Sequence, residues 1–248
     1  MVTVQRYSKP PITEAIIDLR VEKAEDLTLA QLEKCREGEE TAYPTKESLN
    51  LASAQLTLGG QVESFSHSAA VSQIGYKFKS TDGKQIFQVN FEGFTVNWLA
   101  PYPGWEALRD EAHRLWNVYR EQTRPRKVTR IAVRFINRFD FPGTAVELKE
   151  YLLTSPEVSP QLPQQLTGFL MQLAIPQPEL KATLLLSETA VPPPAPNTSS
   201  IALDIDLFRS DELPSDDTGI WNLFEDLRRR KNEIFEACIT DKARELIR

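Results

Sequence analysis

The sequence predicts an α+β fold of two similar halves, each an antiparallel sheet with helices packed on one face. Each half begins with an apolar strand, at residues 15–21 and 131–137. Each half closes on a helix that follows a glycine, and three positions of the first helix recur 115 residues later: Gly104, Leu108 and Ala112 become Gly219, Leu223 and Leu227. Self-similarity at so long a period indicates an internal duplication, because solenoid repeats recur every 20 to 50 residues or so. We place the halves at residues 1–125 and 126–248, with one continuous domain as the alternative.

In the first half, the spacing of apolar residues predicts two helices around a meander of strands. Thr28 is placed to cap a helix at 29–38, and Gln31 occupies the other position of a capping box. Alternation with period two predicts strands at 74–78, 86–91 and 94–98, and Asp82 and Gly83 form a hairpin signal between two of them. An apolar stripe at helical spacing then predicts a helix at 105–122.

The second half is expected to repeat this order. It reads as a strand at 128–139, a helix at 146–153 and strands at 168–174 and 181–187. The prolines at 192–196 cannot enter a sheet and predict an exposed polyproline loop. A strand with an acidic outer face follows at 201–207, then a long helix capped by Asp217 or Thr218, and a short helix from 240 to 248.

Composition is that of an ordinary globular protein. Hydrophobic residues make up 41% of the 248 residues, charged residues 26%, and the formal net charge is −6. No apolar run approaches the roughly 20 residues that span a bilayer, and the first residues lack the apolar core of a secretory signal. We therefore expect a cytoplasmic protein in which Cys35 and Cys238 are reduced core residues.

The pattern of residues gives no support to a catalytic or metal centre. Both histidines, His67 and His113, lack the clustered cysteines and histidines of zinc sites, and neither can be placed in a hydrolytic triad. Phosphate-loop, dinucleotide and esterase motifs are missing from the sequence. We predict no cofactor and no metal, and we interpret His113 as a surface residue of its helix, although Asp110 lies three residues before it.

Basic residues concentrate on the mid-chain strand and make it a candidate site for anions or nucleic acid. The residues concerned are Arg126, Lys127, Arg130, Arg134 and Arg138. Side chains repeat every two residues along a strand, so the last three share one face, where guanidinium groups can bind phosphates or carboxylates. The alternative is that they pair with Asp204 and Asp206 across the sheet. The run at 228–231 reads as a solvated helix face, or as a second wall of the same groove, and the pI near 5.2 disfavours nucleic acid.

Aromatic residues crowd the first half. Trp98, Tyr102 and Trp105 gather where the last strand of that half turns into its helix, a place where a partner protein could dock. The alternative is that the aromatic residues form the core. A third interpretation is an apolar ligand pocket between sheet and helix.

Three short motifs resemble a sporadically distributed, uncharacterised family of bacterial proteins about 250 residues long. They are the P-P-I-x-E-A start at Pro10 to Ala15, the R-x-x-N-R strand from Arg134 to Arg138, and an I-T pair at Ile239 and Thr240. The patchy distribution of that family resembles that of accessory genes, including those of phage-defence and CRISPR neighbourhoods. The resemblance singles out Glu14 and the segment from Arg134 to Arg138, and a pairing of Glu14 with Arg134 or Arg138 would explain both as structural features.

We predict from these observations a non-enzymatic accessory or regulatory protein. It would bind a partner protein through a sheet edge or through the corner of Trp98, Tyr102 and Trp105. One alternative is an RNA-binding or RNA-processing protein that uses the basic strand. The other is a carrier of a small apolar or anionic ligand.

Overall fold

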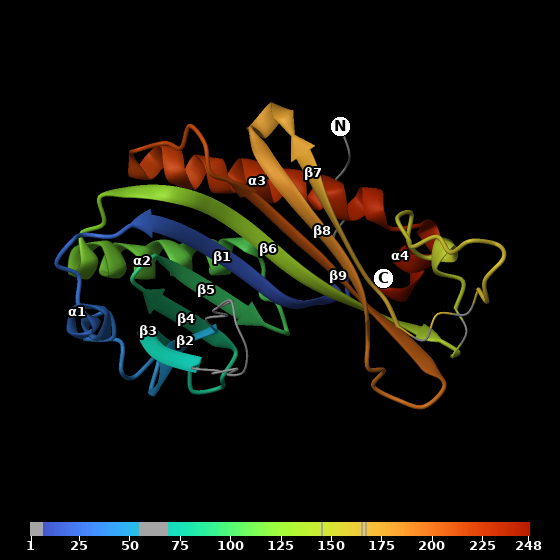
Figure 1. Ribbon diagram of the computed structural model, residues 1–248, viewed down its shortest axis with the longest axis horizontal. Helices are drawn as coiled ribbons and strands as arrows, with labels where there is room; N and C mark the ends of the chain where they lie inside the picture. The colour runs from blue at the N-terminus through green and yellow to red at the C-terminus, as the bar shows by residue number, and fades with distance from the viewer. Residues whose placement is uncertain (1–6, 55–68, 145, 165, 167) are drawn as a thin grey trace, which may run out of the picture.

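A computed structural model describes residues 7–54, 69–144, 146–164, 166 and 168–248. Within these residues nine strands form one sheet in the order β2-β3-β4-β5-β1-β6-β9-β8-β7 (Figure 1). The strands are β1 (Ile12–Glu22), β2 (Thr45–Ala54), β3 (Ala69–Lys79), β4 (Gln85–Asn90), β5 (Gly93–Leu99), β6 (Lys127–Pro142), β7 (Leu170–Gln177), β8 (Ala182–Val191) and β9 (Thr198–Arg209). The helices are α1 (Leu29–Lys34), α2 (Trp105–Thr123), α3 (Asp217–Cys238) and α4 (Asp241–Leu246), with short 3₁₀ turns at Leu148–Glu150 and Pro178–Leu180.

The predicted fold of two similar halves, each an antiparallel sheet with helices packed on one face, is wrong, because the strands form one continuous antiparallel sheet. Strands β1 and β6, which lead the two predicted halves, pair directly with each other from Ile12↔Asn137 to Glu22↔Lys127. Each of them would otherwise leave a row of backbone donors and acceptors unpaired at an edge. Their pairing satisfies both edges and places the two strands at the centre of the sheet.

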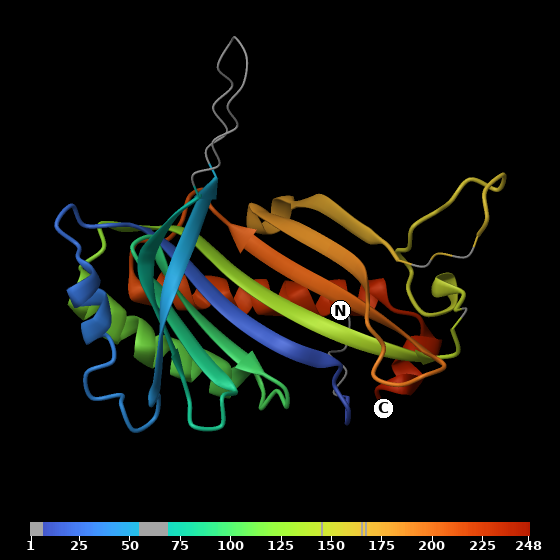
Figure 2. The same ribbon diagram turned by 60° about the horizontal axis from the view of Figure 1, so that its bottom comes forward.

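Helices α2 and α3 cover one face of this sheet (Figure 2). Alternate residues of the central strands point toward the helices and are buried, among them Ile17, Leu19, Val133, Phe135 and Ile205. The two helices are joined by polar contacts along their seam. The indole Nε1 of Trp105 donates to Glu225 at 2.7 Å, and His113 Nε2 lies 2.8 Å from Asp217 Oδ2. His113 thus lies on this seam, whereas His67 lies outside the described residues.

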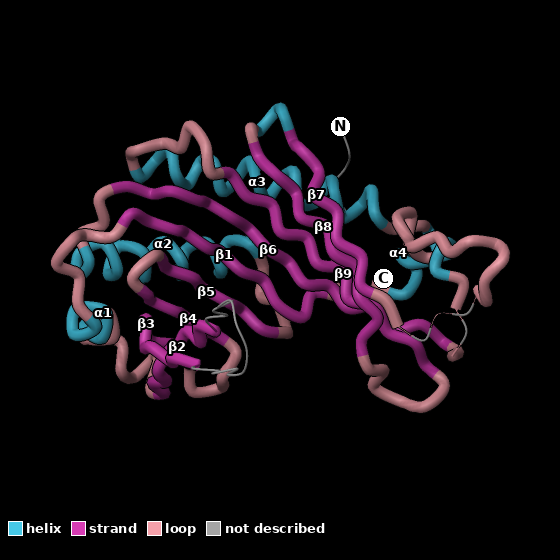
Figure 3. Tube along the Cα trace, in the orientation of Figure 1, coloured by secondary structure: helices cyan, strands magenta, loops and turns pink. Residues whose placement is uncertain are grey.

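Local signals in the sequence agree with the structure at several elements, whose helices and strands are coloured in Figure 3. Thr28 and Gln31 form the predicted capping box, and the prolines lie in an exposed loop between β8 and β9. Strand β2 was not expected, and the predicted helix at 146–153 is only the 3₁₀ turn Leu148–Glu150. Cys35 and Cys238 are free and buried. None of the helices in the described ranges is long and apolar enough to cross a membrane.

Glu188 is an exception to the apolar character of the core. It lies on β8 opposite Leu203 of β9, is 0% exposed, and neither carboxylate oxygen has a hydrogen-bond partner among the described residues. Burial raises its pKa from 4.5 to about 7. The group is therefore protonated in the folded protein over a pH range in which it is ionised in the unfolded chain.

Stability should consequently fall as pH rises from 4.5 to about 7, by about 3 kcal/mol from this group alone. The sign follows because the folded state holds the proton that the unfolded state releases in this window. Glu188→Met should remove this decline, and the exposed control Glu179→Gln should retain it. Urea denaturation at a series of pH values measures both, and equal pH profiles for Glu188→Met and the wild type would refute the assignment.

Candidate anion-binding pocket

A pocket of about 400 Å³ lies between the start of β1, the corner that leads into α2, strand β6 and the middle of α3. Its aromatic walls come from Tyr102, Trp105 and Phe135. Gly104 precedes α2 with φ +124°, a backbone conformation that glycine adopts readily. This turn places Trp105 in the wall of the pocket. The pocket therefore depends on the same corner that the sequence singled out.

Lys231 of α3 lines this pocket and is the most unusual group in it. The residue is only 7% exposed, and its Nζ lies 3.7 Å from the centre of the Phe135 ring. It makes no hydrogen bond or ion pair with any residue in the described part of the chain. Burial, with a smaller effect of the nearby Arg228 charge, lowers its pKa from 10.5 to about 7.

Arg228 lies one helical turn before Lys231 and lines the same pocket. It also lacks an ion pair with the described residues. Two carboxylates in the lining are already engaged: Glu233 pairs with Arg230 at 2.9 Å, and Glu236 pairs with Arg244 at 2.9 Å. Glu236 also accepts a hydrogen bond from Tyr7 at 2.7 Å. These two carboxylates are therefore engaged with other residues, whereas a third carboxylate of the lining, Glu106, makes no ion pair within the described part of the chain.

The corner proposed for partner docking is mostly inside the molecule. Trp105 is 3% exposed, and Tyr102 is half-buried with its ring edge against Phe135 at 5.6 Å between centroids. Trp98 is half-buried opposite Ala15 of β1 and does not line the pocket. Tyr102 and Trp105 thus form walls of a cavity. A cavity is better suited to binding a small ligand than to binding the flat surface of a protein.

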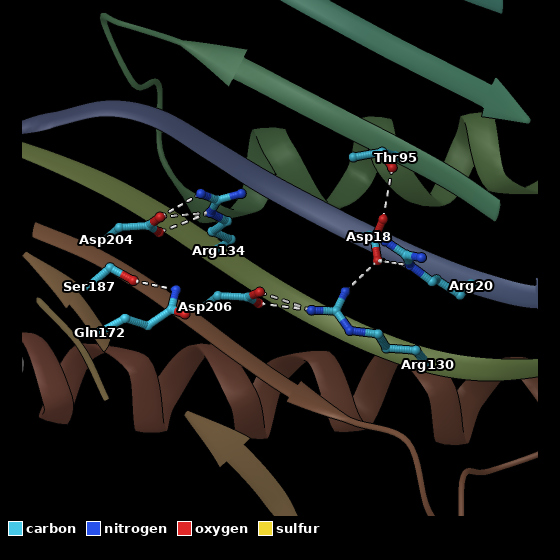
Figure 4. Close-up of polar contacts among 9 residues, drawn as sticks. All are labelled: Asp18, Arg20, Thr95, Arg130, Arg134, Gln172, Ser187, Asp204 and Asp206. Carbon is cyan, nitrogen blue, oxygen red and sulfur yellow. Dashed lines mark hydrogen bonds and ion pairs between the residues drawn. The ribbon is translucent and has the colours of Figure 1, made fainter. Parts of the chain in front are cut away.

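The arginine side chains of the basic strand lie on the face of the sheet opposite the helices. They are paired with carboxylates (Figure 4). Arg130 lies between Asp18 and Asp206, at 2.6 and 2.9 Å, and its guanidinium also stacks on Phe208. Arg134 binds Asp204 through two nitrogens, at 2.5 and 2.9 Å. This is the cross-sheet pairing that the sequence offered as the alternative to a binding site.

The remaining basic residues of the strand have acidic neighbours as well. Arg126 and Lys127 both pair with Glu22, and Arg138 pairs with Asp140 at 2.9 Å. Anion or nucleic-acid binding by this strand stays a prediction, and these pairs weigh against it. Glu14 accepts a hydrogen bond from Asn97 at 2.6 Å. After the hydrogen bond with Asp204, the charge of Glu14 is among the smaller effects that raise the pKa of Arg134, and the pairing of Glu14 with Arg134 or Arg138 stays a prediction.

Sequence reasoning missed Lys231 because it stands at the end of a basic run, which predicts a solvated face. A signal was present. Lys231 follows Leu227 by four residues and precedes Phe235 by four, so it falls on the apolar stripe of α3. Arg229, in the same run, is exposed and pairs with Asp226 at 2.8 Å. Helical spacing thus separates the buried cation from its solvated neighbours.

Arg130→Met should destabilise the protein by about 2 kcal/mol at neutral pH, because it leaves Asp18 and Asp206 partly buried without their shared cation. Burial already raises the pKa of Asp206, so the loss should become smaller as the pH is lowered and Asp206 takes up a proton. Arg134→Met is the matched control. Its side chain is 45% exposed, and its loss should stay below about 1 kcal/mol. Equal losses in chemical denaturation would contradict this ranking.

No group of three or more His, Cys, Asp or Glu side chains that could hold a metal ion occurs among the described residues. The chain matches no protein-family model, and no curated protein matches it significantly. The resemblance to the uncharacterised bacterial family therefore stays a prediction, and the case for function depends on the pocket.

Proposed function

We propose that this protein binds a small organic anion in the pocket lined by Tyr102, Trp105, Phe135, Arg228 and Lys231. The observation that carries the proposal is Lys231, a buried lysine that lines the cavity and makes no ion pair with the described residues. A buried charge is costly unless something pairs with it, and an anionic ligand would supply that pair.

The aromatic walls add a second requirement on the ligand. Pockets that bind small molecules are mostly apolar with a few placed polar groups, and a volume of about 400 Å³ falls in their usual size range. A carboxylate joined to an aromatic or aliphatic body meets both requirements, with the charge at Arg228 and Lys231 and the body against Tyr102 and Trp105.

This proposal develops the carrier interpretation of the sequence. Partner-protein binding at a sheet edge, with its phage-defence or CRISPR context, stays a prediction. Burial of Trp105 weighs against the corner as a docking surface, and the paired arginines of β6 weigh against RNA.

Calorimetric titration with hydrocinnamate, which joins a phenyl ring to a carboxylate, tests the proposal. At about pH 6 the wild type should bind it, because the amine of Lys231 is then mostly charged. Lys231→Met and Arg228→Gln should each weaken binding roughly tenfold or more, since a hydrogen bond to a charged group is worth about 1.5–3 kcal/mol.

The matched control is Arg229→Gln, which removes a charge from the same helix outside the pocket and should leave the affinity unchanged. The uncharged analogue hydrocinnamyl alcohol should bind much more weakly than the acid. Equal binding of acid and alcohol, or an equal effect of Arg229→Gln, would show that the pocket does not select an anion.

A further inference from the structure

Lys231 and Arg228 differ in what they can do for a ligand, although both line the pocket. The guanidinium of Arg228 is permanently charged and binds carboxylates in a planar fork. Lys231 is 7% exposed as a residue, and its amine lies against the Phe135 ring. One group is a fixed anchor, and the other is an amine placed in an apolar wall one helical turn away.

A lysine amine becomes a nucleophile when it loses its proton, and two features of this pocket favour that loss. Burial disfavours the ammonium form, and the Arg228 charge adds to the effect, so the pKa of Lys231 falls to about 7. An ordinary lysine is almost fully protonated at neutral pH. Here a substantial fraction is the free amine, the form that attacks a carbonyl carbon.

We propose that Lys231 forms a reversible imine with an oxo acid whose carboxylate is held by Arg228. This inference rests on the proposed function, because the same pocket must first accept the acid. It narrows the ligand from any organic anion to one that also carries a ketone or aldehyde group within reach of the amine.

The step is balanced without a further reactant. The Lys231 Nζ lone pair forms a bond to the carbonyl carbon as the C=O π bond breaks, and the oxygen takes up a proton that the nitrogen releases, which gives a carbinolamine. Loss of that oxygen as water, with the second proton coming from the nitrogen, leaves the C=N bond. Protonation of the imine gives an iminium cation, and addition of water reverses every step.

The surroundings of the amine suit this chemistry. Phe135 of β6 covers one side, Tyr102 stands at the corner before α2, and the charged groups that line the pocket are Arg228, Glu106, Glu233 and Glu236. Glu233 and Glu236 are held in ion pairs with Arg230 and Arg244. Glu106, exposed in the first turn of α2, is placed to exchange protons with solvent during dehydration.

Borohydride trapping tests the imine directly. The full chain is incubated with phenylpyruvate or benzoylpropionate, which set the carbonyl at different distances from the carboxylate, and is then reduced with sodium cyanoborohydride. Intact-mass spectrometry should show one adduct equal to the acid minus water plus two hydrogens. Peptide mapping should place it on Lys231, with at least tenfold less labelling in Lys231→Arg and in Arg228→Gln.

Two comparisons separate this inference from the proposed function. Hydrocinnamate lacks the carbonyl and should bind without labelling, whereas benzylacetone lacks the carboxylate and should label weakly. Binding of hydrocinnamate with no oxo-acid adduct on Lys231 would overturn the imine and leave anion binding intact. Lysine labelling spread over the surface, unchanged in Lys231→Arg or Lys231→Met, would also overturn it. Failure of hydrocinnamate itself to bind would overturn the proposed function.

Discussion

The antiparallel pairing of β1 with β6 is the interaction on which the rest of this structure depends. It joins the first strands of the two halves of the chain. The described strands of both halves therefore form one sheet of nine strands. It also forms one side of the pocket, because Ile12 pairs with Asn137 at its edge and Phe135 lies two residues earlier on β6. Asn137 is buried and donates to the carbonyls of Phe135 and Leu203, which ties β6 to β9 at the same place.

The two faces of this sheet carry charge in different ways. On the face away from the helices, arginines and aspartates alternate across β1, β6 and β9 and neutralise one another, as Arg130 does between Asp18 and Asp206. On the helical face, Lys231 and Arg228 line a cavity and make no ion pair with the described residues, although Glu106, Glu233 and Glu236 also line it. The chain as a whole is acidic, so this unpaired positive charge is local. A buried cation against an open cavity is the arrangement expected of a binding site.

Much of the local structure could be predicted from the sequence, because the signals are short-range. The alternation at 201–207 and the capping box at Thr28 both depend on neighbours within a few residues. The joining of the halves could not be predicted this way, since Ile12 and Asn137 are far apart in the chain and pair only in the folded sheet. An apolar pocket between sheet and helix was one interpretation of the sequence, but its buried lysine was missed, because Lys231 belongs by composition to a basic run and by helical phase to the buried stripe. Helical phase determines where the side chain points.

Lys231 is proposed to be a buried, titratable amine whose charged form binds an anion. The most direct measurement is an NMR titration of its ¹⁵Nζ resonance in the wild-type protein, assigned with Lys231→Met, with and without saturating hydrocinnamate. We predict a pKa of about 7 in the free protein and a clear rise when the acid is bound, because a neighbouring carboxylate stabilises the ammonium form. A pKa that stays at the usual 10.5 and does not respond to the acid would contradict the account.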